Sequence, residues 1–219
     1  SLSDAAAAIE YAVDNGAQVI NMSLGGPIGS STEMRAVNYA LDAGVVVVAS
    51  SGNDGFTDAV GYPAAFDGVI AVGAVDSNYE ITSYSNQGEA LDIVAPGGVQ
   101  FVDNNGDGVA DGVLQETFYG SQWGYYPMHG TSMASPHVAG LAALLIANGL
   151  TDGEEVFKAI TTTASDLGDE GWDTVYGHGL IHPEAALYYP EDAPADGGGG
   201  GGGGAGGGGE GGGSESQPL

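Results

Sequence analysis

Hydrophobic and polar positions along the first half of the chain alternate between two periods. Residues 3–15 follow the helical period, with a Ser or Asp cap before them and Gly16 as the stop. We expect the following side chains to lie near one face of this helix: Ala6, Ile9, Tyr11 and Val13. Residues 17–26, AQVINMSLGG, predict a buried strand that ends in glycine.

The same alternation recurs further along the chain. Residues 31–44 predict a second helix that stops at Gly44, and residues 45–50, VVVVAS, form an uninterrupted apolar run. Residues 69–76 and 91–97 add two short strands, each closed by turn residues. Strands that alternate with helices indicate βαβ units, so the pattern predicts an α/β fold with a mostly parallel sheet.

The second half of the chain continues this fold. Residues 132–148 form the most apolar helix, which we expect to be buried on most sides. Residues 152–164 predict a helix with acidic residues in its first turn, and residues 177–189 predict a short strand and a helix. Residues 1–190 therefore form one domain. The acidic, Gly-rich residues 191–219 predict a disordered linker or tail, which we interpret as cut short at its carboxyl end.

Composition narrows the possible functions. Two Lys or Arg against 29 Asp or Glu give a formal net charge of −27, which disfavours nucleic acid and anionic membrane surfaces as partners. The same balance suits divalent cations, basic peptides or solubility in salty water. The chain has no cysteine, which excludes disulfides and thiol chemistry. No apolar run is long enough to span a membrane, and no signal segment opens the chain.

Residues 129–140, HGTSMASPHVAG, place Ser132 between a glycine turn and the apolar helix. Capping that helix is the commoner role of a serine at such a position. Gly130, however, lets the backbone approach closely, and a helix amino terminus favours negative charge that develops beside the serine. The stretch therefore also fits an acyl-transfer nucleophile.

Two more glycine turns follow predicted strands. The turn SSGNDG would present Asn53 at the carboxyl edge of its strand, where a side-chain amide can donate to an oxyanion. The turn NMSLGGP ends the preceding strand with glycines that leave the backbone uncovered. Such an edge can pair with an extended peptide.

With these motifs in view, the chain resembles the subtilisin-like serine proteases of peptidase family S8. GTSMASPHVAG resembles their nucleophile motif, and SLGGP, SSGNDG, YPAAFDGVIAVGAVD, YSNQGEALDIVAPGG and YGHGLIHPEAAL resemble successive segments in the family's order. The resemblance implies a three-layer fold, Ser132 as nucleophile and Asn53 as oxyanion-hole donor. It implies groove walls that bind an extended protein or peptide substrate, formed by Ser23, Leu24, Gly25, Gly26, Ala49, Ser50, Ser51 and Gly52. Asp54 would lie near the mouth of the first specificity pocket.

The sequence departs from the family pattern at the other two members of the triad. No Asp-Thr-Gly or Asp-Ser-Gly strand end precedes Ser132, and no HGTHVAG-like helix start occurs. His137 matches a structural histidine of the family that we expect to be packed and hydrogen-bonded, and we expect turn or surface roles for His129, His178 and His182. We therefore interpret the chain as the carboxyl-terminal part of a peptidase domain, with its amino-terminal strands missing and inactive alone. The alternatives are a peptide-binding pseudoprotease or a secreted, calcium-binding structural module.

An inserted loop at about residues 98–128 contains a candidate calcium site. DNNGDGVADG, residues 103–112, resembles a calcium loop in its spacing, with Gly108 at the sharp turn. The candidate ligands are Asp103, Asn105, Asp107, Asp111 and the Val109 carbonyl. The pattern is incomplete, because Leu114 stands where an EF-hand needs Glu, and a solvated turn is the alternative. Calcium binding and the resemblance together predict an extracellular or cell-envelope protein.

Aromatic residues gather in the second half of the same insertion. They are Tyr119, Trp123, Tyr125 and Tyr126. This cluster could line a substrate cleft or cover the insertion, and we favour the cover.

Overall fold

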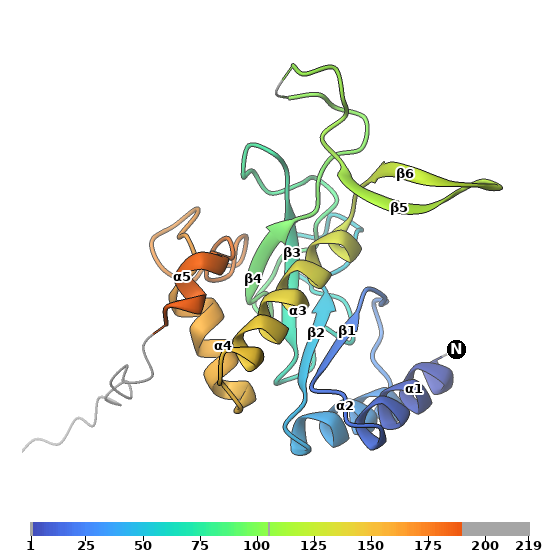
Figure 1. Ribbon diagram of the computed structural model, residues 1–219, viewed down its shortest axis with the longest axis vertical. Coiled ribbons are helices and arrows are strands. Elements are labelled where there is room, and N and C mark those ends of the chain that lie inside the picture. The colour runs from blue at the N-terminus through green and yellow to red at the C-terminus, as the bar shows by residue number, and fades with distance from the viewer. Residues whose placement is uncertain (1, 105, 190–219) are drawn as a thin grey trace, which may run out of the picture. The chain divides into compact units, whose positions relative to one another are not determined.

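Four parallel strands form the centre of the structure (Figure 1). The computed structural model describes residues 2–104 and 106–189 of the chain. The strands, in both chain order and spatial order, are β1 (Val19–Met22), β2 (Val46–Ser50), β3 (Ile70–Val75) and β4 (Ile93–Pro96). The predicted parallel sheet is therefore confirmed, and all its strands end at one edge, where their loops begin.

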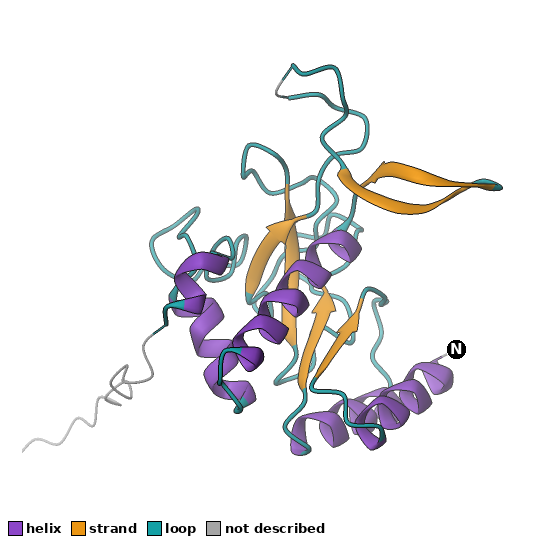
Figure 2. Ribbon diagram, in the orientation of Figure 1, coloured by secondary structure: helices purple, strands orange, loops and turns teal. Residues whose placement is uncertain are grey.

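Helices cover both faces of this sheet (Figure 2). On one face lie α1 (Leu2–Asp14) and α2 (Ser31–Asp42), and on the other lie α3 (Thr131–Ala147), α4 (Gly153–Thr162) and α5 (Pro183–Leu187). Alternate residues of β2 pack against the two helix layers, because successive side chains of a strand point to opposite faces of the sheet. Val46 and Val48 pack in the α3 layer, whereas Val47 and Ala49 pack in the α1–α2 layer. The three-layer arrangement expected from the sequence is confirmed.

Local sequence fixes where the helices begin and end. The Ser30 hydroxyl caps α2 by accepting the Glu33 amide hydrogen bond, and Asp152 caps α4 through the Glu154 amide. The stops predicted at Gly16 and Gly44 adopt φ of 81° and 77°, a backbone conformation that glycine tolerates without steric cost. These caps and stops explain why the predicted helices appear nearly at their predicted bounds.

Three burial expectations were wrong. Tyr11 is 70% exposed, because the buried stripe of α1 runs through Ala6 and Ile9. Only Met22 of β1 is buried, since β1 lies at an edge of the described sheet. Helix α3 buries one face and exposes the stripe Pro136, His137, Gly140, Ala143 and Leu144.

The predicted inserted loop contains regular structure in its second half. Strands β5 (Val113–Tyr119) and β6 (Gln122–Met128) pair in antiparallel register around a turn with Gly120 at φ 62°. They form a separate two-stranded sheet that projects beyond the helix layers (Figure 1). The short strand expected before α5 is reduced to isolated bridges from Leu180 to Val94 and Ser165. The predicted tail, 191–219, lies outside the described residues.

Asp92 is a partly buried carboxyl group at the edge of the sheet opposite the strand ends. Its Oδ2 accepts the Ala71 amide hydrogen bond at 2.7 Å, but burial raises its pKa from 3.8 to about 6. It borders a cavity of about 450 Å³ that is lined by residues of β2, β3 and α4. The folded protein therefore binds the Asp92 proton more tightly than the unfolded chain does.

We expect Asp92→Asn to stabilise the protein at neutral and higher pH. Because the folded pKa is raised, the benefit of the neutral carboxyl is complete below pH 3.8 and is lost as pH rises through about 6. Asparagine keeps an acceptor for Ala71 and stays neutral, so the free energy of unfolding should rise by about 1–3 kcal/mol near pH 8 and change little near pH 4. Urea unfolding across this range measures it. An equal effect at both pH values, or the same pH profile for exposed Asp67→Asn, would contradict the assignment.

Candidate active site

Ser132 occupies the first turn of α3, at the sheet edge where β1 and β2 end (Figure 1). Gly130 precedes the helix at φ 139°, which a side chain rarely tolerates, and the buried Thr131 opens the helix. Ser132 itself is half-buried. The glycine turn predicted from the sequence therefore presents the serine at a helix amino terminus, where backbone N–H groups favour developing negative charge.

A pair of hydrogen bonds joins Ser132 to the end of β1. The Ser132 hydroxyl donates to the Ser23 carbonyl oxygen at 3.3 Å, and the Ser23 hydroxyl donates to the Ser132 carbonyl oxygen at 2.9 Å. Pro136, four residues after Ser132, has no N–H with which to bond that carbonyl in the usual helical pattern. The Ser23 hydroxyl therefore satisfies a helix carbonyl that the proline leaves free.

Asn53 is held beside the start of α3 by its own carbonyl group. Its Oδ1 accepts hydrogen bonds from the Thr131 amide at 2.9 Å and from the Thr131 hydroxyl at 3.0 Å. These two bonds fix the orientation of the side-chain amide and leave Nδ2 as its donor. No acceptor for Nδ2 is found within the described part of the chain. The geometry suits an oxyanion-hole donor, which must be oriented before charge develops.

Asn86, which the sequence reasoning missed, organises the loop that carries Asn53. It is only 1% exposed, and its Oδ1 accepts hydrogen bonds from the amides of Asp54 at 2.9 Å and Phe56 at 3.2 Å. A Cβ on Gly52 would clash with Asn86 Nδ2, so only glycine fits there. The sequence carries no signal for this role, because YSNQG is flanked by the polar residues Ser83 and Glu89 and its partners lie 32 and 30 residues away.

Tyr84 is a second positioning residue that sequence reasoning did not identify. Its hydroxyl donates to the Gly98 carbonyl at 2.7 Å and accepts the Gly130 amide hydrogen bond at 3.1 Å. Burial raises the pKa of this phenol, which keeps the hydroxyl protonated and able to donate. Tyr84 thus ties the first residue of the insertion to the glycine before the nucleophile turn.

A cavity of about 230 Å³ joins the predicted groove residues to the serine. Its lining includes Leu24, Gly25, Gly26, Ser50, Gly52, Asn53, Asp54 and Ser132. The predicted wall residues Ala49 and Ser51 are fully buried, so their side chains support the groove from within and do not line it. Ser51 does so by donating to the Asn86 carbonyl at 3.0 Å.

The glycine segment after β1, Gly25 and Gly26, has backbone hydrogen-bonding groups on two sides. Those on one side are paired within the protein, and those on the other side are available. Gly26 exchanges both backbone hydrogen bonds with Tyr62, at 2.9 and 2.8 Å. Gly25 makes no backbone hydrogen bond to any other described residue. Because adjacent residues of an extended segment direct their backbone groups to opposite sides, Gly25 can pair with an added strand on the Ser132 side.

None of the four histidines makes a hydrogen bond to Ser132 in the described structure. His129 bonds Gln100, and His182 caps α5 by accepting the Ala185 amide hydrogen bond. His178 lies against Phe157, and burial lowers its pKa. His137 is hydrogen-bonded to the Met133 carbonyl at 2.8 Å, as expected, but it is exposed on α3 and not packed.

The candidate calcium loop uses its carboxylates for internal turns. Asp103 accepts hydrogen bonds from the amides of Gly106 and Gly108, and Asp107 accepts one from Val109. Asp111 accepts one from the Asn104 amide. Asn105 lies outside the described residues. Within those ranges no group of three acidic or histidine side chains is placed to hold a metal ion.

Comparisons with known proteins agree with this geometry. The family model described as the subtilase family matches residues 1–179. The chain belongs to the subtilase family. Subtilisin DY of Bacillus licheniformis is 45% identical over 81% of this chain and 60% of its own length. The thermophilic serine proteinase of Bacillus sp. strain AK1 is 44% identical over 86% of this chain and 42% of its own length.

A solved structure shares the subtilase fold. A protease from Pseudoalteromonas arctica superimposes with a TM-score of 0.75 at 36% identity, covering 85% of this chain and 58% of that one. The chain thus spans less than two thirds of the length of these relatives. Among the described residues, no helix is long and apolar enough to cross a membrane.

We expect Ser23→Ala to lower the free energy of unfolding by about 1–2 kcal/mol, because it leaves the Ser132 carbonyl without its donor. In a Pro136→Ala background the loss should be smaller, since an alanine at that position supplies the missing helical N–H. A double-mutant cycle measured by urea unfolding tests the coupling. Exposed Ser77→Ala should cost the same in both backgrounds. Equal costs of Ser23→Ala in the two backgrounds would refute the role assigned to its hydroxyl.

Proposed function

We propose that this subtilase chain carries the nucleophile half of a serine endopeptidase active site. Ser132 attacks the scissile carbonyl, and Asn53 Nδ2 with the Ser132 amide stabilises the oxyanion of the tetrahedral intermediate. The observation that carries the proposal is the fixed Asn53 amide, whose carbonyl is held by Thr131 at 2.9 Å beside the serine. Capping the Thr131 amide needs only an acceptor, whereas this side chain also places a donor, Nδ2, beside the serine.

The general base and its orienting carboxylate would come from residues outside this sequence. Without a base the Ser132 hydroxyl stays protonated and is a poor nucleophile. The four histidines of the chain make their hydrogen bonds and ring contacts with residues other than Ser132. An added His would take the Ser132 proton and return it to the leaving amine, and an added Asp would hold that imidazole in the required tautomer.

The substrate would be an extended polypeptide segment. The available edge at Gly25 and the cavity beside Ser132 support strand-like binding of the residues on the acyl side of the scissile bond. Asp54 borders that cavity, so acidic side chains are disfavoured there. We place this activity outside the cytoplasm, on the strength of the acidic composition and the family.

A peptide-binding pseudoprotease is the second candidate function. The same groove supports it, because peptide binding needs the free edge at Gly25 but not a base. Catalysis distinguishes the two functions.

Expression of the complete coding sequence that contains these residues tests the protease function. We expect casein hydrolysis by that protein, none by the 219-residue chain alone, and complete loss in Ser132→Ala. Asn53→Ala should lower kcat by about 100- to 1,000-fold with little change in KM, the range established for an oxyanion-hole donor in a subtilisin. Asn148→Ala, far from Ser132 at the other end of α3, serves as control. Peptide binding without hydrolysis in the complete protein would favour the pseudoprotease.

We further propose calcium as a structural ligand of residues 103–112, supported by the ligand-like spacing of that segment. Binding would require Asp103 and Asp107 to exchange their backbone partners for the ion. Calorimetric titration should detect one calcium ion per chain, and Asp103→Asn with Asp107→Asn should remove it. The same titration on Asp166→Asn is the control. No heat of binding, or heat that survives the double substitution, would refute the proposal.

A further inference from the structure

The β5–β6 hairpin has two faces of different character. Residues directly opposite in an antiparallel pair share a face, and the pairing places Phe118 with Trp123 and Glu116 with Tyr125. The other face is half-buried at the base of the hairpin, where Val113 and Tyr126 lie, and exposed near the turn, at Tyr119 and Gln122. The exposed side, here called the outer face, consists of Leu114, Glu116, Phe118, Trp123, Tyr125 and Pro127.

The outer face is an unusually exposed apolar surface. Its four large apolar side chains, Leu114, Phe118, Trp123 and Tyr125, are between 59% and 69% exposed. On this face, the rings of Phe118 and Trp123 are in edge-to-face contact, with ring centroids 4.8 Å apart. Of the four aromatic residues expected to cover the insertion, Tyr119, Trp123 and Tyr125 are exposed, contrary to that expectation, and Tyr126 is half-buried. A contiguous apolar patch of this kind marks an interaction surface.

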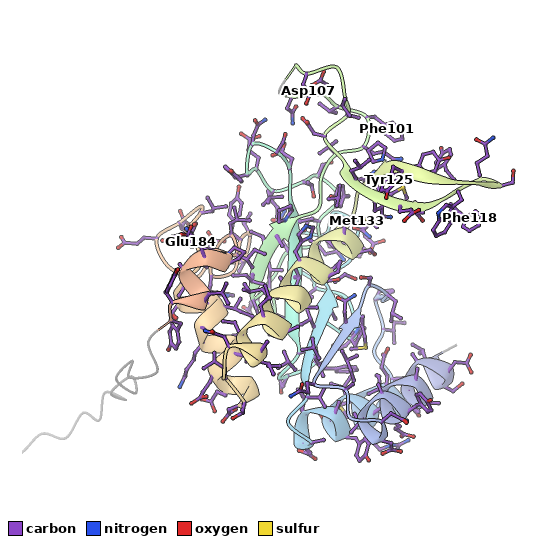
Figure 3. The ribbon with its side chains drawn as sticks, in the orientation of Figure 1. Phe101, Asp107, Phe118, Tyr125, Met133 and Glu184 are labelled. Atoms are coloured by element: carbon purple, nitrogen blue, oxygen red, sulfur yellow. The ribbon has the colours of Figure 1, made fainter. Side chains whose placement is uncertain are left out.

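The hairpin adjoins the candidate active site. Strand β6 leads within four residues to Ser132, and the base of the hairpin and the first turns of α3 border a cavity of about 220 Å³ lined by Val113, Gln115, Met133, Pro136 and His137. Figure 3 shows Phe118 and Tyr125 on the hairpin arm, which starts near Met133 at the beginning of α3. The base of the hairpin therefore lies next to the helix that carries Ser132.

Charge selects among possible partners for this face. Glu116 is the only carboxylate in the two strands, and it accepts a hydrogen bond from Trp123 Nε1 at 2.8 Å in the middle of the apolar side chains. A second copy of the chain would bring another net charge of −27, which opposes self-association. An apolar segment that also carries Lys or Arg satisfies both the aromatic surface and Glu116.

We propose that the outer face is a docking surface for polypeptide substrates, selecting segments in which apolar residues alternate with Lys or Arg. The proposal rests on the proposed function, because it takes the substrate to be a polypeptide that also reaches Ser132. Leu-type side chains pack on Phe118 and Trp123, and a basic side chain pairs with Glu116. The hairpin thereby adds substrate selection outside the groove.

A binding experiment on the 219-residue chain tests the docking surface independently of catalysis. Trp172→Phe leaves Trp123 as the sole tryptophan, so its emission reports on the outer face. The probe is a soluble, capped peptide with three Leu-Lys repeats, compared with Ser-Lys and Leu-Glu peptides of equal length. We expect a blue shift of Trp123 emission and a Kd at least about tenfold lower for the Leu-Lys peptide than for either other peptide.

Matched variants assign the effect to the outer face. Phe118→Ser with Tyr125→Ser should raise the Kd by at least about tenfold, whereas Tyr11→Ser, an equally exposed tyrosine on α1, should leave it unchanged. Glu116→Gln keeps the acceptor for Trp123 and removes the charge, so it should abolish the preference for Lys over Glu but not that for Leu over Ser. Far-UV circular dichroism and urea midpoints must match the parent chain for these variants to be compared.

Several outcomes would overturn the proposal. Equal affinity for the three peptides would exclude selection by the outer face. A shift of Trp123 emission with a neutral oligosaccharide but not with peptide would show that the outer face binds carbohydrate. Concentration-dependent dimerisation that is lost in the variant with Phe118→Ser and Tyr125→Ser would show that the face mediates self-association. In the complete protein, a Trp123 emission already shifted without peptide would show that other residues of that protein cover the face. Casein hydrolysis with no peptide docking would remove this inference and leave the proposed function intact.

Discussion

The arrangement at Ser132 depends on a helix carbonyl that has no partner within its own helix. Proline at position 136 removes the N–H that would bond the Ser132 carbonyl, and a buried or half-buried acceptor left unpaired is costly. The Ser23 hydroxyl supplies the bond at 2.9 Å from the end of β1. Because the Ser132 hydroxyl in turn donates to the Ser23 carbonyl oxygen, any shift of Ser132 also disturbs the end of β1. The helix defect therefore fixes the serine against the substrate site.

The second anchor is Asn53, in the loop that follows β2, and the two anchors bind the successive residues Thr131 and Ser132. Thr131 binds the Asn53 carbonyl through both its amide and its hydroxyl, which orients the free end of that amide. The side chain of Asn86 then holds this loop, because its Oδ1 accepts hydrogen bonds from the backbone amides of Asp54 and Phe56. An oxyanion hole needs such preorganisation, since donors that must reorient during the reaction contribute less to lowering the barrier. The Asn53 amide is thus held rigidly on the side where the proposed function needs an oxyanion donor.

Sequence patterns predicted the parts of this structure that depend on local chemistry. Uniform apolar runs such as VVVVAS predicted buried parallel strands, and Gly16, Gly44 and Gly130 marked the ends of elements correctly, because these features depend on burial and φ alone. Asn53 follows the carboxyl end of β2, at the edge where the neighbouring parallel strands also end. Ser132 instead opens α3 after the β5–β6 hairpin, and hydrogen bonds to Ser23 join it to the same edge. Contacts between distant segments were not predictable. Asn86 lies 32 residues from Asp54 in the sequence, and no periodicity connects a polar residue to the loop that it will support.

The β5–β6 hairpin could not be predicted from the sequence either. Its strands lack the apolar–polar alternation that identifies a half-buried strand, because its outer face is as apolar as its inner face. Composition therefore favoured a loop with a covering cluster, whereas the register of β5 and β6 gave the aromatic residues an exposed side of their own. A two-stranded sheet gains little stability alone, so the hydrogen bond from Tyr84 to Gly98 matters in fixing where the insertion leaves the body of the protein. The negative net charge of the chain attracts basic partners at long range, and the apolar outer face adds attraction at short range. Salt screens the electrostatic attraction but does not weaken the apolar contact. Docking by this surface should therefore become less dependent on charge, and more on Phe118 and Trp123, as ionic strength rises.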